Sequence, residues 1–344
     1  AIRLLAAGAV VGVEGLGNWY GGLGDTRLAM LASVVTMVVN LAFNWALIYG
    51  NLGAPALGVA GAAWASVIAS WVGFAAIAAY YAVDRGERAF ARLRAAAAAG
   101  DRPLVDPAHL PAPPLPGGAS RLGELLRMRR YGLPNGANWF LEFSAFLVFI
   151  NFSVAGLGTT SVAALMAVLQ LNSLSFMPAF GITTAGAILV GQAIGAGAHG
   201  LVPAVVARTA RITVAWQGLV GLLYLAIPGP LLVLFADGDA EPGSIAALGA
   251  VLLAISAAWQ VFDALAMTLR AAGDTFWCLA ARVGLAWALW LPLAYLVVVY
   301  RGGDAAAATW VMVAYFVALT LALAWRFRTG AWRRIELTGR AAPH

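Results

Sequence analysis

The chain has 344 residues, of which 62% are hydrophobic and only 10% are charged. A soluble domain carries roughly 25% charged residues, so this composition excludes an ordinary soluble protein. The formal net charge is +6, and every basic residue apart from histidine is Arg. These Arg residues fall mostly at alternate ends of apolar runs, which the positive-inside rule explains without a nucleic-acid partner.

Apolar runs of about 20 residues, enough to cross a hydrocarbon core of roughly 30 Å, recur along the chain. They favour helices, because barrel strands would alternate in hydrophobicity over about ten residues. The sequence therefore predicts an all-α, polytopic helical membrane protein with about nine transmembrane helices. The expected spans are residues 1–22, 27–49, 56–82, 128–156, 161–192, 204–235, 243–271, 277–300 and 305–327.

The first expected helix carries Glu14, and Gly-Asp-Thr follows ten residues later, at residues 24–26. Acids in an apolar span are costly, so Glu14 is a candidate for ion or proton handling. The alternative is a pair with Arg3 or a water-facing position. Asp25 is explained more simply as the N-cap of the next helix, after a glycine that ends the first.

The long polar stretch after the third expected helix holds six prolines and a Gly-Gly pair, and such a segment is typical of a linker. Three expected helices precede it and six follow, so we expect a twelve-helix parent whose first three helices are missing here. The expected domains are 1–84 (remainder of an N-terminal lobe), 85–126 (cytoplasmic linker), 127–327 (C-terminal six-helix lobe) and 328–344 (cytoplasmic tail).

The C-terminal lobe carries two more acids in apolar runs, Glu142 and Asp263, and Gly-Asp-Thr again follows the second by ten residues. A duplicated pattern of this kind is typical of secondary transporters. Counted from the cytoplasmic helix ends at about 1.5 Å per residue, the two acids lie roughly 18 and 15 Å deep. We therefore expect them at one level in neighbouring helices.

Paired carboxylates in a low-dielectric setting cannot both stay ionised cheaply. The pair can hold one proton, or one Na⁺ with oxygens of Asn138 or Ser144. A cationic drug would use the same carboxylates, which is a physical basis for antiport. We expect cation coupling at Glu142, Asp263 and Glu14; the alternative is that the acids only fix helix packing.

Other polar and aromatic side chains in mid-helix are candidates for a substrate cavity, because aromatic faces bind flat organic cations. The candidates are Asn138, Gln170, Asn172, Gln260, Phe140 and Trp259. For the amides the alternative is hydrogen bonding between helices, and for the aromatics it is packing against lipid.

Other classes of site find little support in the sequence. A single cysteine, Cys278, excludes an intrachain disulfide, and the three histidines have no metal-ligand spacing. No Ser-His-Asp arrangement is evident, so we do not expect an enzyme, a metal site or a cofactor other than H⁺ or Na⁺ as coupling ion.

Several segments share their order and spacing with one transporter family. They are residues 22–27, 40–44, 47–50 and 54–65 before the linker, and Gly132-Leu133-Pro134, residues 177–196 and residues 260–264 after it. They resemble the fourth to eighth and the tenth helices of the MATE (multidrug and toxin extrusion) transporters. Asn40 and Asn44 stand where another branch carries an acid, so the chain is most similar to the NorM-like branch.

The resemblance implies two six-helix lobes that form an inverted V around a central cavity. It implies a monomeric exporter of amphipathic organic cations, driven by H⁺ or Na⁺ and located in the bacterial inner membrane. Glu142 and Asp263 match the coupling acids of that branch, but Trp259 replaces a tyrosine of some Na⁺-linked members. The alternative is a lipid-linked saccharide flippase, which would need several Arg in its cavity; Arg270 and Arg282 are expected only at helix ends.

Overall fold

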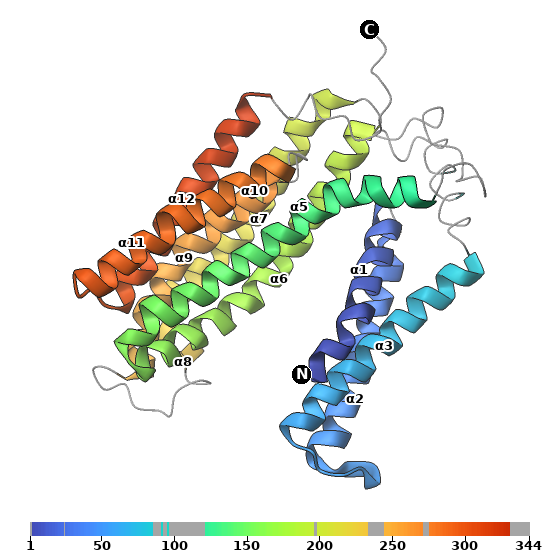
Figure 1. Ribbon diagram of the computed structural model, residues 1–344, viewed down its shortest axis with the longest axis horizontal. Coiled ribbons are helices and arrows are strands. Elements are labelled where there is room, and N and C mark those ends of the chain that lie inside the picture. Colours follow the sequence, from blue (N-terminus) through green and yellow to red (C-terminus); the bar gives the residue numbers. More distant parts are fainter. Residues whose placement is uncertain are drawn as a thin grey trace. The chain divides into compact units, whose positions relative to one another are not determined.

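The computed structural model (Figure 1) describes residues 2–23, 25–84, 121–195, 198–232, 244–270 and 275–330, with two isolated positions at 91 and 95. These parts of the chain are almost wholly helical and contain no strand. They belong to two compact units, Ala1–Pro116 and Gly117–His344, which are described separately. Most of the expected linker lies outside the described residues, and α5 begins at Arg121, before the linker was expected to end.

The described residues of unit 1 form three long helices, coloured blue to cyan in Figure 1. Its helices are α1 (Ala7–Gly22, after the short 3₁₀ turn Ile2–Ala6), α2 (Thr26–Tyr49) and α3 (Val59–Asp84). They pack around a small core of Tyr20, Ala32 and Ile77. Gly50 ends α2 with a φ of 75°, a left-handed conformation that favours glycine. Asp25 stands at the N-cap position of α2, as the sequence predicts, although its carboxylate makes no capping hydrogen bond.

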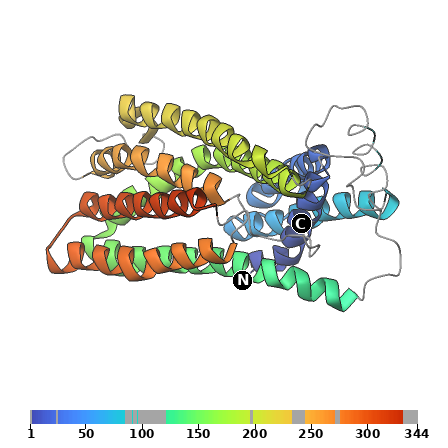
Figure 2. The ribbon, with the colours of Figure 1, turned by 90° about the horizontal axis from the view of Figure 1, so that it is seen from above.

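Unit 2 is a larger bundle whose long helices run side by side in Figures 1 and 2. Its elements are α5 (Arg121–Val148), continued by the π-helical η4 (Phe149–Val154), and α6 (Thr159–Gly195), α7 (Val202–Ala226), α8 (Pro228–Leu232) and α9 (Ile245–Arg270). They are followed by α10 (Thr275–Gly284), η7 (Leu285–Trp290), α11 (Leu291–Tyr295) and η8 (Leu296–Tyr300), which form one rod, and by α12 (Ala305–Arg328).

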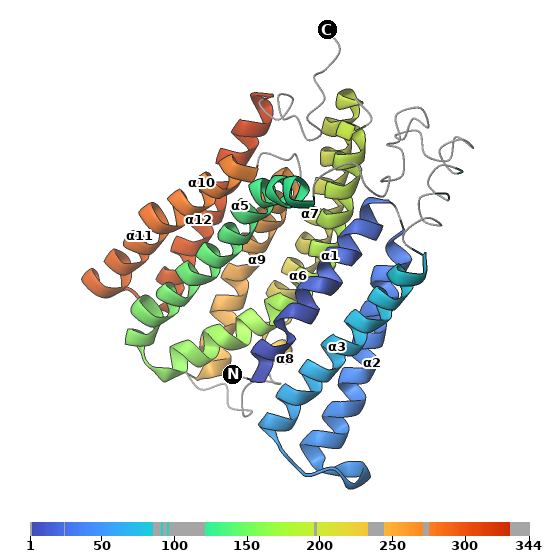
Figure 3. The same ribbon diagram turned by 45° about the vertical axis from the view of Figure 1, so that its right-hand side comes forward.

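Helix α9 is the centre of unit 2. It packs against α6 and α7 on one side and against α12 on the other (Figure 3). Leu252, Leu253 and Ala266 on this helix are fully buried. The rod that starts with α10 packs against α5 and α12. An acid on α9 is therefore placed close to side chains of several neighbouring helices.

Seven helices among the described residues are long and apolar enough to cross a membrane. Five of them lie in unit 2 and two, α2 and α3, in unit 1. The other two expected spans also form helices. One is α1, which is only 16 residues long, and the other is α7, which carries Arg208 and Arg211 and ends at Ala226, two residues before Pro228. The all-α membrane architecture predicted from the sequence is confirmed.

Candidate substrate and coupling site

Glu142 lies on α5, within a membrane-spanning segment, and its carboxylate is ion-paired with Arg282 of α10. Nη1 of Arg282 donates a hydrogen bond to Oε1 of Glu142. The two residues are 140 positions apart in sequence and meet because α5 and α10 run side by side (Figure 1). The sequence predicts that Glu142 shares a proton or Na⁺ with Asp263, and it does not predict this ion pair with a guanidinium.

The sequence predicts Arg282 only as a residue at a helix end, and the structure shows that its side chain is buried. Only 5% of its surface is exposed. It follows Phe276, the first residue of its membrane span, by six residues. At about 1.5 Å per residue, that is roughly 9 Å inside the span. Burial does not follow from the sequence, because position along a helix does not tell which neighbours cover the side chain; here α5 and α12 pack against α10.

Asp263 lies on α9, and its half-buried carboxylate is within electrostatic range of three charged groups. These are Arg282, Glu142 and Arg270, in order of decreasing influence. Arg270 ends α9 and lies over the ring of Trp139, 5.8 Å from its centroid. We call Glu142, Asp263, Arg270 and Arg282 the charged cluster. Its formal charge is zero when all four groups are ionised.

A cavity of about 260 Å³ lies beside Glu142, entirely within unit 2. Its lining is mainly aromatic. The aromatic residues are Trp139, Phe143 and Phe146 from α5, Phe176 from α6, Trp259 from α9, Trp290 from η7, and Tyr315 and Phe316 from α12. Trp290 stacks on Tyr315 with centroids 5.2 Å apart, and Trp259 meets Phe316 edge-on at 5.5 Å. These contacts hold the aromatic walls in fixed orientations.

Several buried polar atoms around this cavity have no hydrogen-bond partner among the described residues. They are Glu142 Oε2, Arg282 Nη2, both amide atoms of Asn138, and the indole nitrogens of Trp259 and Trp290. Asn138 precedes Glu142 by one helical turn and is 4% exposed. Buried polar groups are nearly always hydrogen-bonded, so a concentration of unpaired ones marks a place where an ion, water or ligand binds.

Asn172 and Gln260, two predicted cavity residues, hydrogen-bond each other instead of lining this cavity. Nε2 of Gln260 donates to Oδ1 of Asn172 at 2.5 Å. Ser256 donates to the same oxygen at 3.3 Å, and Ser175 donates to Oε1 of Gln260. We call these four residues the amide network. It joins α6 to α9, which is the interhelical alternative considered for these amides.

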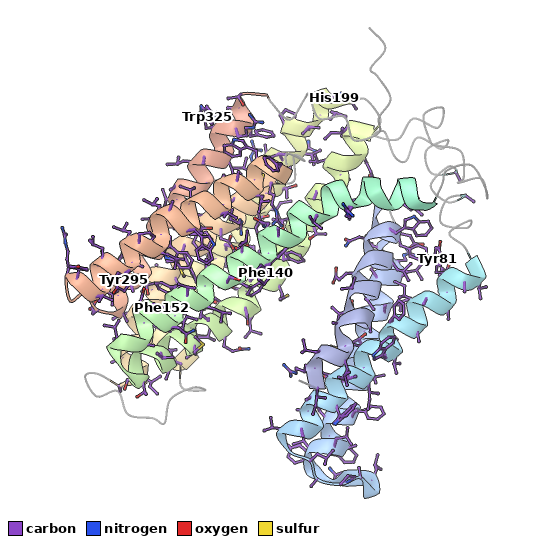
Figure 4. All side chains as sticks on the ribbon, in the orientation of Figure 1. Tyr81, Phe140, Phe152, His199, Tyr295 and Trp325 are labelled. Carbon is purple, nitrogen blue, oxygen red and sulfur yellow. The ribbon has the colours of Figure 1, made fainter. Side chains whose placement is uncertain are left out.

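The remaining predicted residues have different surroundings. Trp259 lines the cavity, and Asn138 is buried near it. Phe140 is 72% exposed and projects from α5 away from the other helices of its unit (Figure 4). Gln170 on α6 and Glu14 on α1 of unit 1 are also exposed. For Phe140, Gln170 and Glu14 the functional assignment stays a prediction.

Sequence reasoning missed Arg282, Trp290 and Tyr315. A signal for the first two existed: Arg282, Ala286 and Trp290 follow each other at four-residue spacing, which places them on one helix face. A charged residue on the same face as a tryptophan, inside an apolar span, indicates a polar site facing the bundle interior. Nothing comparable distinguishes Tyr315, which lies in an evenly apolar helix.

A bundle of membrane-spanning helices with a charged cluster beside an aromatic cavity places the chain among polytopic membrane proteins with a polar site inside the bundle. Residues 136–296 match the family model MatE. A probable multidrug resistance protein NorM of Thermotoga maritima is 30% identical over 283 residues, which cover 81% of this chain and 55% of that protein. The multidrug resistance protein NorM of Burkholderia vietnamiensis is 30% identical over 338 residues, with coverages of 95% and 66%.

Solved structures agree on the fold. A MATE crystal structure in the bent conformation has a TM-score of 0.75 to this chain at 19% identity, covering 97% of this chain and 68% of that one. The chain belongs to the MATE family and is similar to its NorM-named members. It is thus a multi-pass protein of the bacterial inner membrane, in a family of transporters and not of enzymes. The chain spans from about half to about two thirds of the length of these curated relatives.

Proposed function

We propose that the protein is a multidrug efflux antiporter. It exports amphipathic organic cations in exchange for H⁺ or Na⁺ by alternating access. The single observation that carries the proposal is the position of Glu142, an acid inside a membrane span that lines an aromatic cavity. Aromatic faces and a carboxylate together favour a flat cation. The multidrug resistance names of the NorM relatives support the same substrate class.

Coupling rests on the acids of the charged cluster. Glu142 and Asp263 bind the coupling cation, and Glu14 is the corresponding acid of unit 1. A bound cation and a cationic drug both stabilise the same carboxylates, so each lowers the occupancy of the other. This exclusion is the thermodynamic condition for exchange of one for the other.

The cargo contacts are proposed from the cavity and from the exposed polar positions. Trp259 holds an aromatic ring, and Asn138 offers amide groups that have no partner among the described residues. Phe140 and Gln170 contact cargo from the exposed faces of α5 and α6. Asn172 and Gln260, by contrast, act through the amide network, which keeps α6 and α9 together.

The test is transport by the protein in proteoliposomes. Efflux of a fluorescent organic cation is followed under a pH gradient alone and then under a Na⁺ gradient alone. Efflux of the organic cation driven by one of the two gradients establishes antiport and identifies the coupling ion. Absence of drive by either removes the antiporter proposal.

A lipid-linked saccharide flippase is the second candidate, because the buried Arg282 is a cation beside the cavity. That guanidinium is already bound to Glu142, whereas a flippase needs several Arg to hold phosphates. Flipping of a lipid-linked saccharide in the same vesicles, with no efflux of the organic cation, would favour the flippase.

A further inference from the structure

Arg282 is a cation that resides permanently at the site where the proposed function requires an exchangeable one. Its guanidinium is buried, lies within a membrane span and is hydrogen-bonded to Glu142. It also lies within electrostatic range of Asp263 on α9, the helix that precedes α10 in the chain. A second nitrogen, Nη2, has no partner among the described residues, so the planar guanidinium has a donor left for another acceptor.

The charged cluster holds two acids and two Arg, so its negative charge is already compensated. A monocation that enters the aromatic cavity and approaches Glu142 meets the positive charge of Arg282 at the same carboxylate. Two cations at one carboxylate repel each other strongly in a low-dielectric site. The incoming cation therefore binds well only if Arg282 moves away from Glu142.

We propose that Arg282 is a tethered cation that competes with cationic cargo for Glu142. Cargo of the matching class is a flat aromatic monocation, with its rings between Trp259 and Trp290 and its charge at Glu142. Arg282 then turns to Asp263, and its return to Glu142 displaces the cargo. This inference rests on the proposed function, because it names the competitor of cargo at the same site.

The experiment measures binding to the purified protein in detergent, without any ion gradient. The probes are N-methylacridinium, a permanent monocation, and acridine, its neutral counterpart with the same ring system. The variants are Arg282→Gln, which removes the charge but can still donate to Glu142, Arg282→Lys, which keeps the charge, and the same Arg282→Gln change in a Glu142→Gln background.

Arg282→Gln is expected to bind N-methylacridinium about ten-fold more tightly or better, the effect of freeing one charge-assisted hydrogen bond. Arg282→Lys should stay within about three-fold of the unsubstituted protein, and acridine binding should change by less than about two-fold. In the Glu142→Gln background, Arg282→Gln should change N-methylacridinium binding by less than about three-fold, because the contested carboxylate is gone.

Three outcomes would overturn the proposal. Weaker or unchanged N-methylacridinium binding by Arg282→Gln would show that the guanidinium does not compete with cations. Equal gains with and without Glu142 would show general repulsion, not competition for one carboxylate. Equal gains for acridine would show only that the cavity has become larger. If Arg282→Gln does not fold, Arg282→Asn, which is also neutral and can donate to a carboxylate, replaces it with and without Glu142→Gln, with the same expected and contradicting outcomes.

The result separates from that of the transport test. Ion-driven efflux together with unchanged binding by Arg282→Gln would refute the competition between Arg282 and cargo and would leave the antiport proposal standing. Tighter binding by Arg282→Gln without any ion-driven efflux would refute the antiport proposal, and Arg282 would remain a competitor in a cation-binding site.

Discussion

Unit 2 contains two buried polar groupings, and their hydrogen bonding differs. In the amide network, Gln260 and Ser256 donate to Asn172, and Ser175 donates to Gln260. Only Nδ2 of Asn172 lacks a partner among the described residues. In the charged cluster and the adjoining Asn138, one oxygen of Glu142, one nitrogen of Arg282 and both amide atoms of Asn138 have no partner in the part of the chain that the structure describes.

The difference indicates what each grouping does. A satisfied network of uncharged groups fixes two helices against each other and has little capacity left for a ligand. A partly satisfied group of charges is costly to maintain in a membrane span and is retained where it binds something. Mutations in the first should therefore lower stability, whereas mutations in the second should alter binding and transport.

The largest effect is expected on transport. Glu142→Gln and Asp263→Asn should each reduce ion-driven efflux of an organic cation to background, because each removes a carboxylate that the coupling ion and the cargo share. Initial efflux rates in proteoliposomes, at matched protein content, give the measurement. Wild-type rates in both variants would refute the coupling site.

Asp304→Asn is the matched control for an acid outside the charged cluster. Its carboxylate accepts a hydrogen bond from the backbone N–H of Ala307 at 2.8 Å and caps α12. Loss of an N-cap costs roughly 0.5–2 kcal/mol of stability, so this variant should unfold somewhat earlier and still transport.

A smaller effect concerns the stability of the ion pair. Arg282→Met leaves the part-buried Glu142 carboxylate without its partner. Because breaking a fully buried pair costs about 3–5 kcal/mol, we expect a loss of stability of at most about that size. The double variant Glu142→Gln, Arg282→Met should recover most of that loss, because no uncompensated charge remains. Thermal unfolding in detergent, followed by tryptophan fluorescence, measures both. A double variant no more stable than Arg282→Met would show that packing of the Arg side chain, and not its charge, holds this region.

A mutation in the amide network should lower stability and leave cation binding unchanged. Gln260→Met removes two buried hydrogen bonds, one donated to Asn172 and one accepted from Ser175, although each of these partners keeps one other hydrogen bond. Such a change costs about 1–3 kcal/mol. Binding of N-methylacridinium should stay within about two-fold of the unsubstituted protein. A loss of binding with stability unchanged would instead make Gln260 a cavity residue, as the sequence alone predicts.

The sequence was a good guide to whatever depends on position along a helix. Lengths of apolar runs predict the membrane-spanning helices, and the rarity of acids within them points to Glu142 and Asp263. It was a poor guide to partners across helices. Asn172 and Gln260 are 88 residues apart and Glu142 and Arg282 are 140 apart, and neither pairing follows from periodicity.

Arg282 shows the reason for this limit most clearly. The helix rise gives its depth, but burial depends on how α5 and α12 pack against α10. The sequence predicts an aromatic cavity that includes Trp259, but it does not predict that Trp290, Tyr315 and Phe316 complete the lining, since these residues come from separate helices. A residue type inside an apolar span thus predicts that a site exists, while the tertiary packing decides which residues complete it.

The smallest expected effect on stability concerns Phe140, which belongs to neither grouping. Because 72% of its surface is exposed within its own unit, Phe140→Ala should change stability by less than about 0.5 kcal/mol. If Phe140 contacts cargo, as the sequence predicts, the KM for the organic cation should rise about three-fold or more, since an aromatic contact to a cation contributes about 0.5–1 kcal/mol. Phe152→Ala is the matched control, because Phe152 is 65% exposed and lies farther along the same continuous helix, in η4 after α5 (Figure 4). A rise for Phe140→Ala alone would place cargo at that face of α5. Equal, small effects of the two substitutions would mean that both rings pack against lipid, and the cargo contacts would then reduce to the cavity beside Glu142.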